Sequence, residues 1–379
     1  FSTNTFADIK MGIILGFTGP IESLTPAMAA SAELAFKEAS DSGSLLGGQS
    51  ISVERADSTC VDSAAATSAA EGLVSGGVVA IMGADCSGVT GAIATNVAVP
   101  NGVVMISPSA TSPGLTDLAD NGYFFRTAPS DARGGQILAD ITKDRKIKSV
   151  AITYTNNDYG KGLADVYAGA VEAHGIKVTA MAAHEDGKAD YSAEIATLAS
   201  AGGDAVAVIG YLDQGGKGII QGSLDSGAFD TFVLSDGMIG DTLTDAFGND
   251  LNKSFGSLPG STGKGANVFA DVAKAAGIDS SGPYTGESYD AAALITLAMQ
   301  AGGKADRATV QQNVMAVANA PGTKIYPGEL KKALDLLAKG KAVDYEGATG
   351  VNLTEVGEAE GSFLEKEIKG GKFSTKKQR

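Results

Sequence analysis

Short apolar runs alternate with amphipathic stretches along the first 107 residues of the chain. The run Ile9–Leu15 is predominantly apolar and predicts a buried strand, whereas the stretch Pro26–Ala39 carries apolar residues at helical spacing and predicts a helix. Repeated strand–helix–strand units of this length predict a parallel sheet with helices on both faces. The first series comprises predicted strands at 9–15, 50–56, 78–83 and 102–107 and predicted helices at 26–39, 62–75 and 87–98.

A second series of the same kind begins after residues 126–130, where the alternation pauses. Its pattern predicts a second sheet of the same class. A break rich in Gly, Ser and Pro follows at 254–263, and the last stretch returns to β character. The predicted helices are 132–144, 160–174, 191–201, 214–226, 266–276, 287–301, 305–317 and 328–338, and the predicted strands are 149–154, 176–181, 204–211, 231–234 and two short ones near 351–353 and 362–367.

The length of 379 residues is too great for one ordinary hydrophobic core and suits two α/β domains. We therefore expect an α/β fold of two Rossmann-like lobes with parallel central sheets. A three-stranded hinge would join them where the chain crosses near 127–130, 254–260 and 347–350. Lobe 1 is expected to comprise residues 1–127 and 258–347, and lobe 2 residues 128–257 and 348–379. The cleft beneath such a hinge is where a ligand can be enclosed.

The chain carries a formal net charge of −15, which disfavours binding to nucleic acid or anionic lipid. No nucleophile–base motif, phosphate-binding glycine loop or metal-binding histidine motif is present. The two histidines, His174 and His184, are expected to be exposed to solvent. Asp241 and Asp245 suit the solvent-facing side of a helix better than an acid–base pair. The sequence therefore predicts a binding protein, not an enzyme, with no cofactor and no metal.

Cys60 and Cys86 are the two cysteines of the chain, and each follows a predicted strand at the same end of the first sheet. A disulfide is favoured over two buried thiols, and it would imply an oxidising compartment. The chain opens at Phe1 without the basic and apolar segments of a signal peptide. We interpret this as an exported protein after signal-peptide removal, although a trimmed chain would begin in the same way.

Two segments follow strands, where open α/β sheets place ligand sites. In the first, 83–90, Ser87 starts a helix and presents its hydroxyl and free N–H groups to an anion such as a carboxylate, with a plain helix cap as the alternative. The second, 106–116, is a hydroxyl-rich loop that presents Thr111, with ordinary turn chemistry as the alternative.

At these segments the chain resembles the type I periplasmic substrate-binding proteins of branched-chain amino-acid ABC transporters, the leucine/isoleucine/valine-binding proteins. The resemblance runs in order along essentially the whole chain and also implies a family disulfide between Cys60 and Cys86. The residues that carry it are Gly16-Phe17-Thr18-Gly19-Pro20, Asp57–Cys60, Gly83–Ser87, Met105–Thr116, Asp158-Tyr159-Gly160-Lys161-Gly162 and Ser288-Tyr289-Asp290-Ala291-Ala292.

The resemblance implies a set of ligand contacts from the first lobe. In that family the Ser after the second Cys and the Thr of the Ala-Thr dipeptide hold the ligand carboxylate, which implies these roles for Ser87 and Thr111. The backbone at Ser109 and Ala110 is implied to help hold the ligand ammonium.

The resemblance implies three more contacts from the second lobe. Tyr159 and Tyr211 would close over the ligand, and Asp236 would pair with its ammonium. A zwitterion that leaves water needs both of its charges matched, because burial otherwise costs several kcal/mol.

Three departures from the family pattern bear on specificity. Leu24 ends the segment Ile21–Leu24, where branched-chain binders often place an aromatic residue. Asp85 stands before Cys86 in place of an aliphatic residue, and Asp236 is one carbon shorter than a Glu. If Asp85 lines the side-chain pocket, it would favour a polar or cationic ligand; if it caps the helix at Ser87, the pocket could still be apolar.

The expected function is that of an extracytoplasmic solute-binding protein of an ABC importer, which captures an amino acid, branched-chain or polar, between the lobes. It would be a periplasmic monomer that delivers its ligand to a membrane permease. The alternative is a sensor of the same fold that presents its ligand to a receptor. An enzyme would need a nucleophile–base pair in the cleft, which the sequence does not offer.

Overall fold

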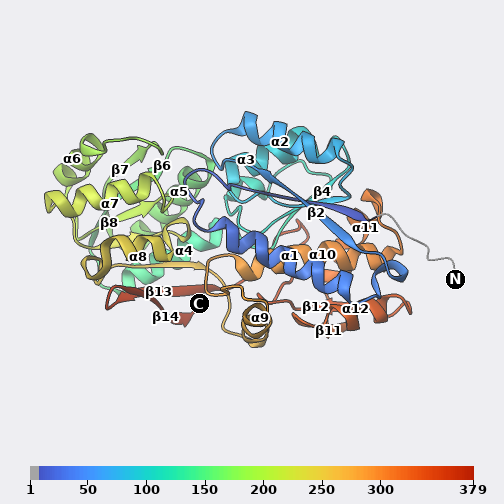
Figure 1. Ribbon diagram of the computed structural model, residues 1–379. Coiled ribbons are helices and arrows are strands. Elements are labelled where there is room, and N and C mark those ends of the chain that lie inside the picture. Colours follow the sequence, from blue (N-terminus) through green and yellow to red (C-terminus); the bar gives the residue numbers. More distant parts are fainter. Residues whose placement is uncertain (1–7) are drawn as a thin grey trace.

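The computed structural model describes residues 8–379, which form two lobes that lie side by side (Figure 1). The first lobe is built on a five-stranded sheet with the order β2-β1-β3-β4-β5 and parallel pairing throughout. Its strands are β1 (Ile9–Leu15), β2 (Ile51–Asp57), β3 (Ala80–Gly83), β4 (Val104–Ser107) and β5 (Phe124–Arg126).

Helices cover both faces of this sheet because its inner strands are apolar on both faces. Along β1, Met11 and Ile13 pack into one core cluster, whereas Ile14 packs into the cluster on the opposite face. The first cluster lies under α1 (Thr25–Asp41), α10 (Thr285–Gly302), α11 (Arg307–Ala318) and α12 (Leu330–Leu337), and the second under α2 (Ser63–Ser75) and α3 (Ser87–Ile93).

The second lobe is built on a seven-stranded sheet with the order β14-β13-β10-β9-β8-β6-β7. The strands from β6 to β10 are parallel, whereas β13 runs antiparallel to β10 and to β14. Helices α4 and α5 cover one face, and α6, α7 and α8 the other. The bounds are β6 (Ser149–Thr155), β7 (Lys177–His184), β8 (Ala205–Ile209), β9 (Phe232–Leu234), β10 (Phe255–Pro259), β13 (Phe363–Lys369), β14 (Lys372–Gln378), α4 (Asp131–Asp144), α5 (Asp158–Ala173), α6 (Ser192–Ala201), α7 (Gly215–Ser226) and α8 (Asp241–Phe247).

The chain passes between the two sheets three times. It leaves the first sheet after β5 and enters α4, returns after β10 to α9 (Lys264–Ala275), and crosses again between β12 (Val343–Tyr345) and β13. A small parallel pair, β11 (Thr323–Ile325) with β12, precedes the last crossing. The predicted α/β fold of two lobes with parallel sheets is therefore confirmed, with an antiparallel edge that the sequence pattern did not predict.

Several predicted elements need correction. The segment 254–263, which was predicted as a break, contains the strand β10. Gly256 is required there by close packing, since a Cβ on this residue would lie 2.2 Å from the carbonyl oxygen of Leu234. The predicted strand near 351–353 is only an isolated bridge from Leu353 to Ala359. The strands β5, β11, β12 and β14 were also not predicted.

The prediction that both histidines are exposed is wrong for His184. This residue ends β7 and is 1% exposed. A hydrogen bond of 2.8 Å joins its Nδ1 to the hydroxyl of Thr153. Asp241 and Asp245 lie on the exposed side of α8, as predicted.

Candidate functional site

A cavity lies between the lobes, at the ends of the parallel strands of both sheets. Tyr284 of lobe 1 also reaches it, from the residue that precedes α10. Among the predicted site residues, Ala110 and Thr111 are buried beside the cavity and do not line it. Its lining residues are Ile21, Leu24, Met28, Asp85, Cys86, Ser87, Ser109, Tyr159, Tyr211, Asp236, Gly237 and Tyr284.

The hydroxyl-rich loop after β4 is folded against the start of α3. The amide of Ser112 donates to Ser87 Oγ at 3.0 Å, and the amide of Ala110 donates to Ser107 Oγ at 2.9 Å. Thr111 is fully buried, yet its Oγ1 has no hydrogen-bond partner among residues 8–379. A buried hydroxyl without a partner is costly, which marks this point of the loop as a place for a further polar group.

The guanidinium of Arg126, 1% exposed, holds this loop in place. Its Nη1 donates to the carbonyls of Ala110 at 3.1 Å and Ser112 at 2.9 Å, on either side of Thr111. Its Nη2 forms an ion pair with Glu358 on the third crossing. Arg126 was not among the predicted site residues. The signal that could have found it is a charged residue directly after the aromatic run 123–125.

The Asp85 carboxylate accepts three hydrogen bonds from within lobe 1. Oδ2 accepts from the amide of Gly16 at 2.5 Å, and Oδ1 accepts from the Ser58 hydroxyl and the amide of Cys86, each at 2.9 Å. Burial raises the pKa of Asp85, while these hydrogen bonds oppose the rise. Asp85 thus ties together the ends of β1, β2 and β3, and it does not cap α3, whose N-cap residue is Cys86.

Two tyrosines and an aspartate form the wall of the cavity on lobe 2. The rings of Tyr159 and Tyr211 are stacked, with centroids 5.2 Å apart. The hydroxyl of Tyr159 donates to Asp236 Oδ1 at 2.7 Å, and the hydroxyl of Tyr284 donates to Oδ2 of the same carboxylate from lobe 1. Burial raises the pKa of Asp236, and these hydrogen bonds from Tyr284 and Tyr159 oppose the rise. Tyr284 was missed because it comes from an inserted segment with no strand before it.

Lobe 1 contributes a group of apolar side chains to the cavity lining. These are Ile21, Leu24 and Met28, from the loop after β1 and the first turn of α1. A Cβ on Gly240 of lobe 2 would lie 3.2 Å from Leu24 Cδ2, so the two lobes are in contact here. The cavity lining therefore combines apolar side chains with hydroxyl groups and the carboxylates of Asp85 and Asp236.

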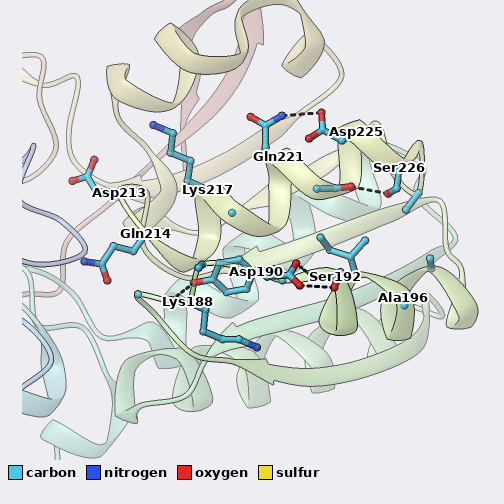
Figure 2. A pocket seen from close by; sticks show the side chains of 18 residues that line it. Lys188, Asp190, Ser192, Ala196, Asp213, Gln214, Lys217, Gln221, Asp225 and Ser226 are labelled. Atoms are coloured by element: carbon cyan, nitrogen blue, oxygen red, sulfur yellow. Dashed lines mark hydrogen bonds between the residues drawn. The ribbon is translucent and has the colours of Figure 1, made fainter.

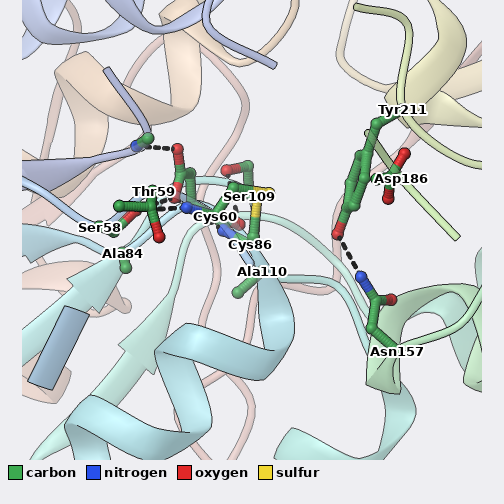
Figure 3. The surroundings of a disulfide bond; sticks show 12 residues. Ser58, Thr59, Cys60, Ala84, Cys86, Ser109, Ala110, Asn157, Asp186 and Tyr211 are labelled. Atoms are coloured by element: carbon green, nitrogen blue, oxygen red, sulfur yellow. Dashed lines mark hydrogen bonds between the residues drawn. A yellow bond between two sulfur atoms is a disulfide. The ribbon is translucent and has the colours of Figure 1, made fainter. Parts of the chain in front are cut away.

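The predicted disulfide between Cys60 and Cys86 is present, with the Cα atoms 5.1 Å apart. Figure 3 shows it next to Ser58, Ser109 and Ala110, so it borders the site. Across from it, Asn157 Nδ2 donates to the Tyr211 hydroxyl at 3.4 Å. The disulfide thus fixes the loop after β2 to the start of α3, from which Ser87 projects.

A wider groove of about 930 Å³ lies on lobe 2, between α6 and α7 (Figure 2). Its side chains are of mixed charge, with Lys188 and Lys217 alongside Asp190 and Asp225, and it is open to solvent. Since no lobe 1 residue lines it, it lacks the two-sided enclosure of the interlobe cavity.

Among residues 8–379, no helix has the length and apolar character needed to cross a membrane. Nor does this part of the chain gather three His, Cys, Asp or Glu side chains into a group suited to a metal ion.

The family described as periplasmic binding protein matches residues 8–333. The chain belongs to this family. Its members are solute-binding proteins, which confirms the interpretation of the sequence as a binding protein and not an enzyme.

Individual relatives of this periplasmic binding protein agree with the family assignment. The leucine-, isoleucine-, valine-, threonine- and alanine-binding protein of Pseudomonas aeruginosa is 28% identical over 81% of this chain and 82% of the relative. The Leu/Ile/Val-binding protein homolog 3 of Brucella melitensis is 32% identical, over 57% of this chain and 58% of the relative. A branched-chain amino acid transporter substrate-binding protein of Streptococcus pneumoniae, solved with isoleucine, shares the fold with a TM-score of 0.80, 22% identity and coverage of 98% and 99%.

Proposed function

We propose that the protein is an extracytoplasmic solute-binding protein of an ABC importer and that it captures an amino acid with an aliphatic side chain in the interlobe cavity. The observation that carries this proposal is that the cavity is lined both by the apolar side chains of Ile21, Leu24 and Met28 and by hydroxyl groups and the carboxylates of Asp85 and Asp236. The names of the relatives support the same class of ligand.

The polar groups at the cavity suit the two charged groups of an amino acid. Ser87 and the hydroxyl of Thr111 would bind the carboxylate. The backbone at Ser109 and Ala110 would help to hold the ammonium. Asp236 would bind the ammonium, with Tyr159 and Tyr211 closing over the ligand. Matching both charges offsets the cost of taking a zwitterion out of water.

The apolar part of the lining makes a cationic side chain a poor fit. The sequence left open whether Asp85 faces the ligand. Its carboxylate lines the cavity but already accepts three hydrogen bonds within lobe 1, which occupy most of its acceptor sites. Leu24, with Ile21 and Met28, would instead contact an apolar side chain. A leucine-sized ligand therefore fits this chemistry better than a lysine-sized one.

We propose that ligand binding draws together the two lobes, lobe 1 with residues 1–127 and 258–347 and lobe 2 with 128–257 and 348–379. A ligand that contacts both lobes favours the closed arrangement. The closed protein would act as a periplasmic monomer that delivers its ligand to a membrane permease.

A thermal-shift screen of ligand-stripped protein tests the proposal. L-leucine, L-isoleucine or L-valine at a hundred times its dissociation constant is expected to add about 2.7 kcal/mol of stability, whereas L-lysine and benzoate are expected to give no shift. Asp236→Asn should lose the response, and Asp245→Asn, on the exposed side of α8, should keep it. No shift with any α-amino compound would overturn the proposal.

A further inference from the structure

A second carboxylate lies behind Asp236 and was not among the predicted site residues. Asp131 is the first residue of α4, where the first crossing enters lobe 2, and it is 3% exposed. Its amide donates to the carbonyl of Thr111 at 2.8 Å, which places it next to the loop that borders the ligand cavity. Its Oδ2 has no hydrogen-bond partner in the described part of the chain.

Asp131 and Asp236 both line a small cavity, and no lysine or arginine lines it. Arg126 is close enough to influence Asp131, but its guanidinium is occupied by two carbonyls, the hydroxyl of Thr116 and the carboxylate of Glu358. Asp236 is the residue that this cavity shares with the ligand cavity. The lining residues of the small cavity are Asp131, Gly134, Leu138, Leu163, Ser235, Asp236, Ser257, Pro259 and Phe363.

Two buried carboxylates without a cation are electrostatically unfavourable. Burial raises the pKa of Asp131 well above its usual range, and the charge of Asp236 raises it further, while the neighbouring Thr111 hydroxyl and the charge of Arg126 oppose the rise. Either a proton or a positively charged group must compensate them. A primary ammonium suits this place because its three N–H donors can serve more than one carboxylate.

We propose that Asp131 is a second anionic contact for the ligand's amino group, so that a bound primary ammonium lies between Asp131 and Asp236. This inference rests on the proposed function. The carboxylate and ammonium of an α-amino acid share one carbon, so Thr111 and Asp131, which are joined by a backbone hydrogen bond, would contact its two charged groups. Such a site selects for the amino group itself and rejects a carboxylic acid that lacks it.

Titration calorimetry with the full chain tests the inference, using L-leucine and 4-methylpentanoate, the same acid without the amino group. Asp131→Asn is expected to weaken L-leucine binding by about 10- to 100-fold, since a charge-assisted hydrogen bond is lost. Its affinity for 4-methylpentanoate should stay equal or rise. Asp245→Asn, which removes an exposed carboxylate from the same lobe, should leave both affinities within about twofold.

Two outcomes would overturn the inference: an unchanged affinity of Asp131→Asn for L-leucine, or an equal loss for both ligands. If unaltered protein binds none of the aliphatic amino acids, the proposed function fails first and separately. Should the variant not fold, a crystal structure of unaltered protein with L-leucine decides the matter. The ammonium nitrogen is expected within about 3.2 Å of Asp131 Oδ2, and a separation above about 4 Å would contradict the proposal.

Discussion

At the scale of single residues, two buried charged side chains hold neighbouring segments of the chain together. Asp85 joins three strand ends, and Arg126 joins a loop to a crossing segment. Asp85 lines the ligand cavity and Arg126 does not, and the hydrogen bonds of both side chains are made to neighbouring segments of the chain. The role of both side chains is to hold backbone in place. Residue type alone does not reveal such a role, and for Asp85 it suggested a ligand contact instead.

His184 gives a pH dependence that can be worked out. Burial lowers its pKa to about 4 from the ordinary value of 6.5. Between these two values the unfolded chain binds more protons than the folded protein does, so stability falls as the pH drops from 6.5 toward 4. The loss attributable to this residue is up to about 3 kcal/mol.

The measurement is urea unfolding of the unaltered protein and of His184→Gln at pH 7.5, 5.5 and 4.5. The variant should be the less stable at pH 7.5 because Gln does not match the ring's packing between Thr153 and Tyr191, yet its stability should fall less steeply with acid. Identical slopes for the two proteins would show that His184 is not the group that titrates.

At the scale of elements, the disulfide carries the clearest prediction. Cys60 and Cys86 are 26 positions apart, and closing a loop of that length contributes about 3–4 kcal/mol on the chain-entropy account. The double variant Cys60→Ser/Cys86→Ser should lose this much free energy of unfolding, measured in urea. As a control, a thiol reductant should destabilise the unaltered protein and leave the variant unaffected.

Elements with continuous apolar runs were predictable, because strands buried on both faces leave that pattern in the sequence. The strands β10 and β14 were not, since Gly256 is needed for close packing and Lys372–Gln378 forms an exposed edge rich in lysine. The same limit applies to the site. Segments that follow strands were identified. Tyr284, which reaches the cavity from the start of α10, and Asp131, which lies behind Asp236 at the start of α4, were not, because only the fold brings them to Asp236.

At the scale of the whole molecule, the lobes are also joined at the rim of the cleft. Asp213 of lobe 2 accepts from the amide of Ser23 at 2.9 Å and donates its own amide to the carbonyl of Pro20 at 3.0 Å. The hydroxyl of Thr242 also donates to this carboxylate. Because Asp213 does not line the ligand cavity, these bonds stabilise closure without touching a ligand.

Asp213→Ala is therefore expected to weaken amino-acid binding about fivefold, since the closed arrangement loses a hydrogen bond of about 1 kcal/mol. Titration calorimetry measures this effect, and small-angle scattering should show a larger radius of gyration. Asp245→Ala, an exposed substitution in the same lobe, should change neither. An unaltered affinity in Asp213→Ala would mean that the rim contacts do not bias closure.

The ion pair of Arg126 with Glu358 has a consequence for exchanging parts between relatives. Its two members lie 232 positions apart, on the first and third crossings, although they form one buried unit. A chimaera joined anywhere between them inherits one partner from each parent. Unless both parents carry the same pair, a buried charge is left without its counterpart, which destabilises a fold strongly. Productive recombination in this chain must therefore transmit the two crossings together.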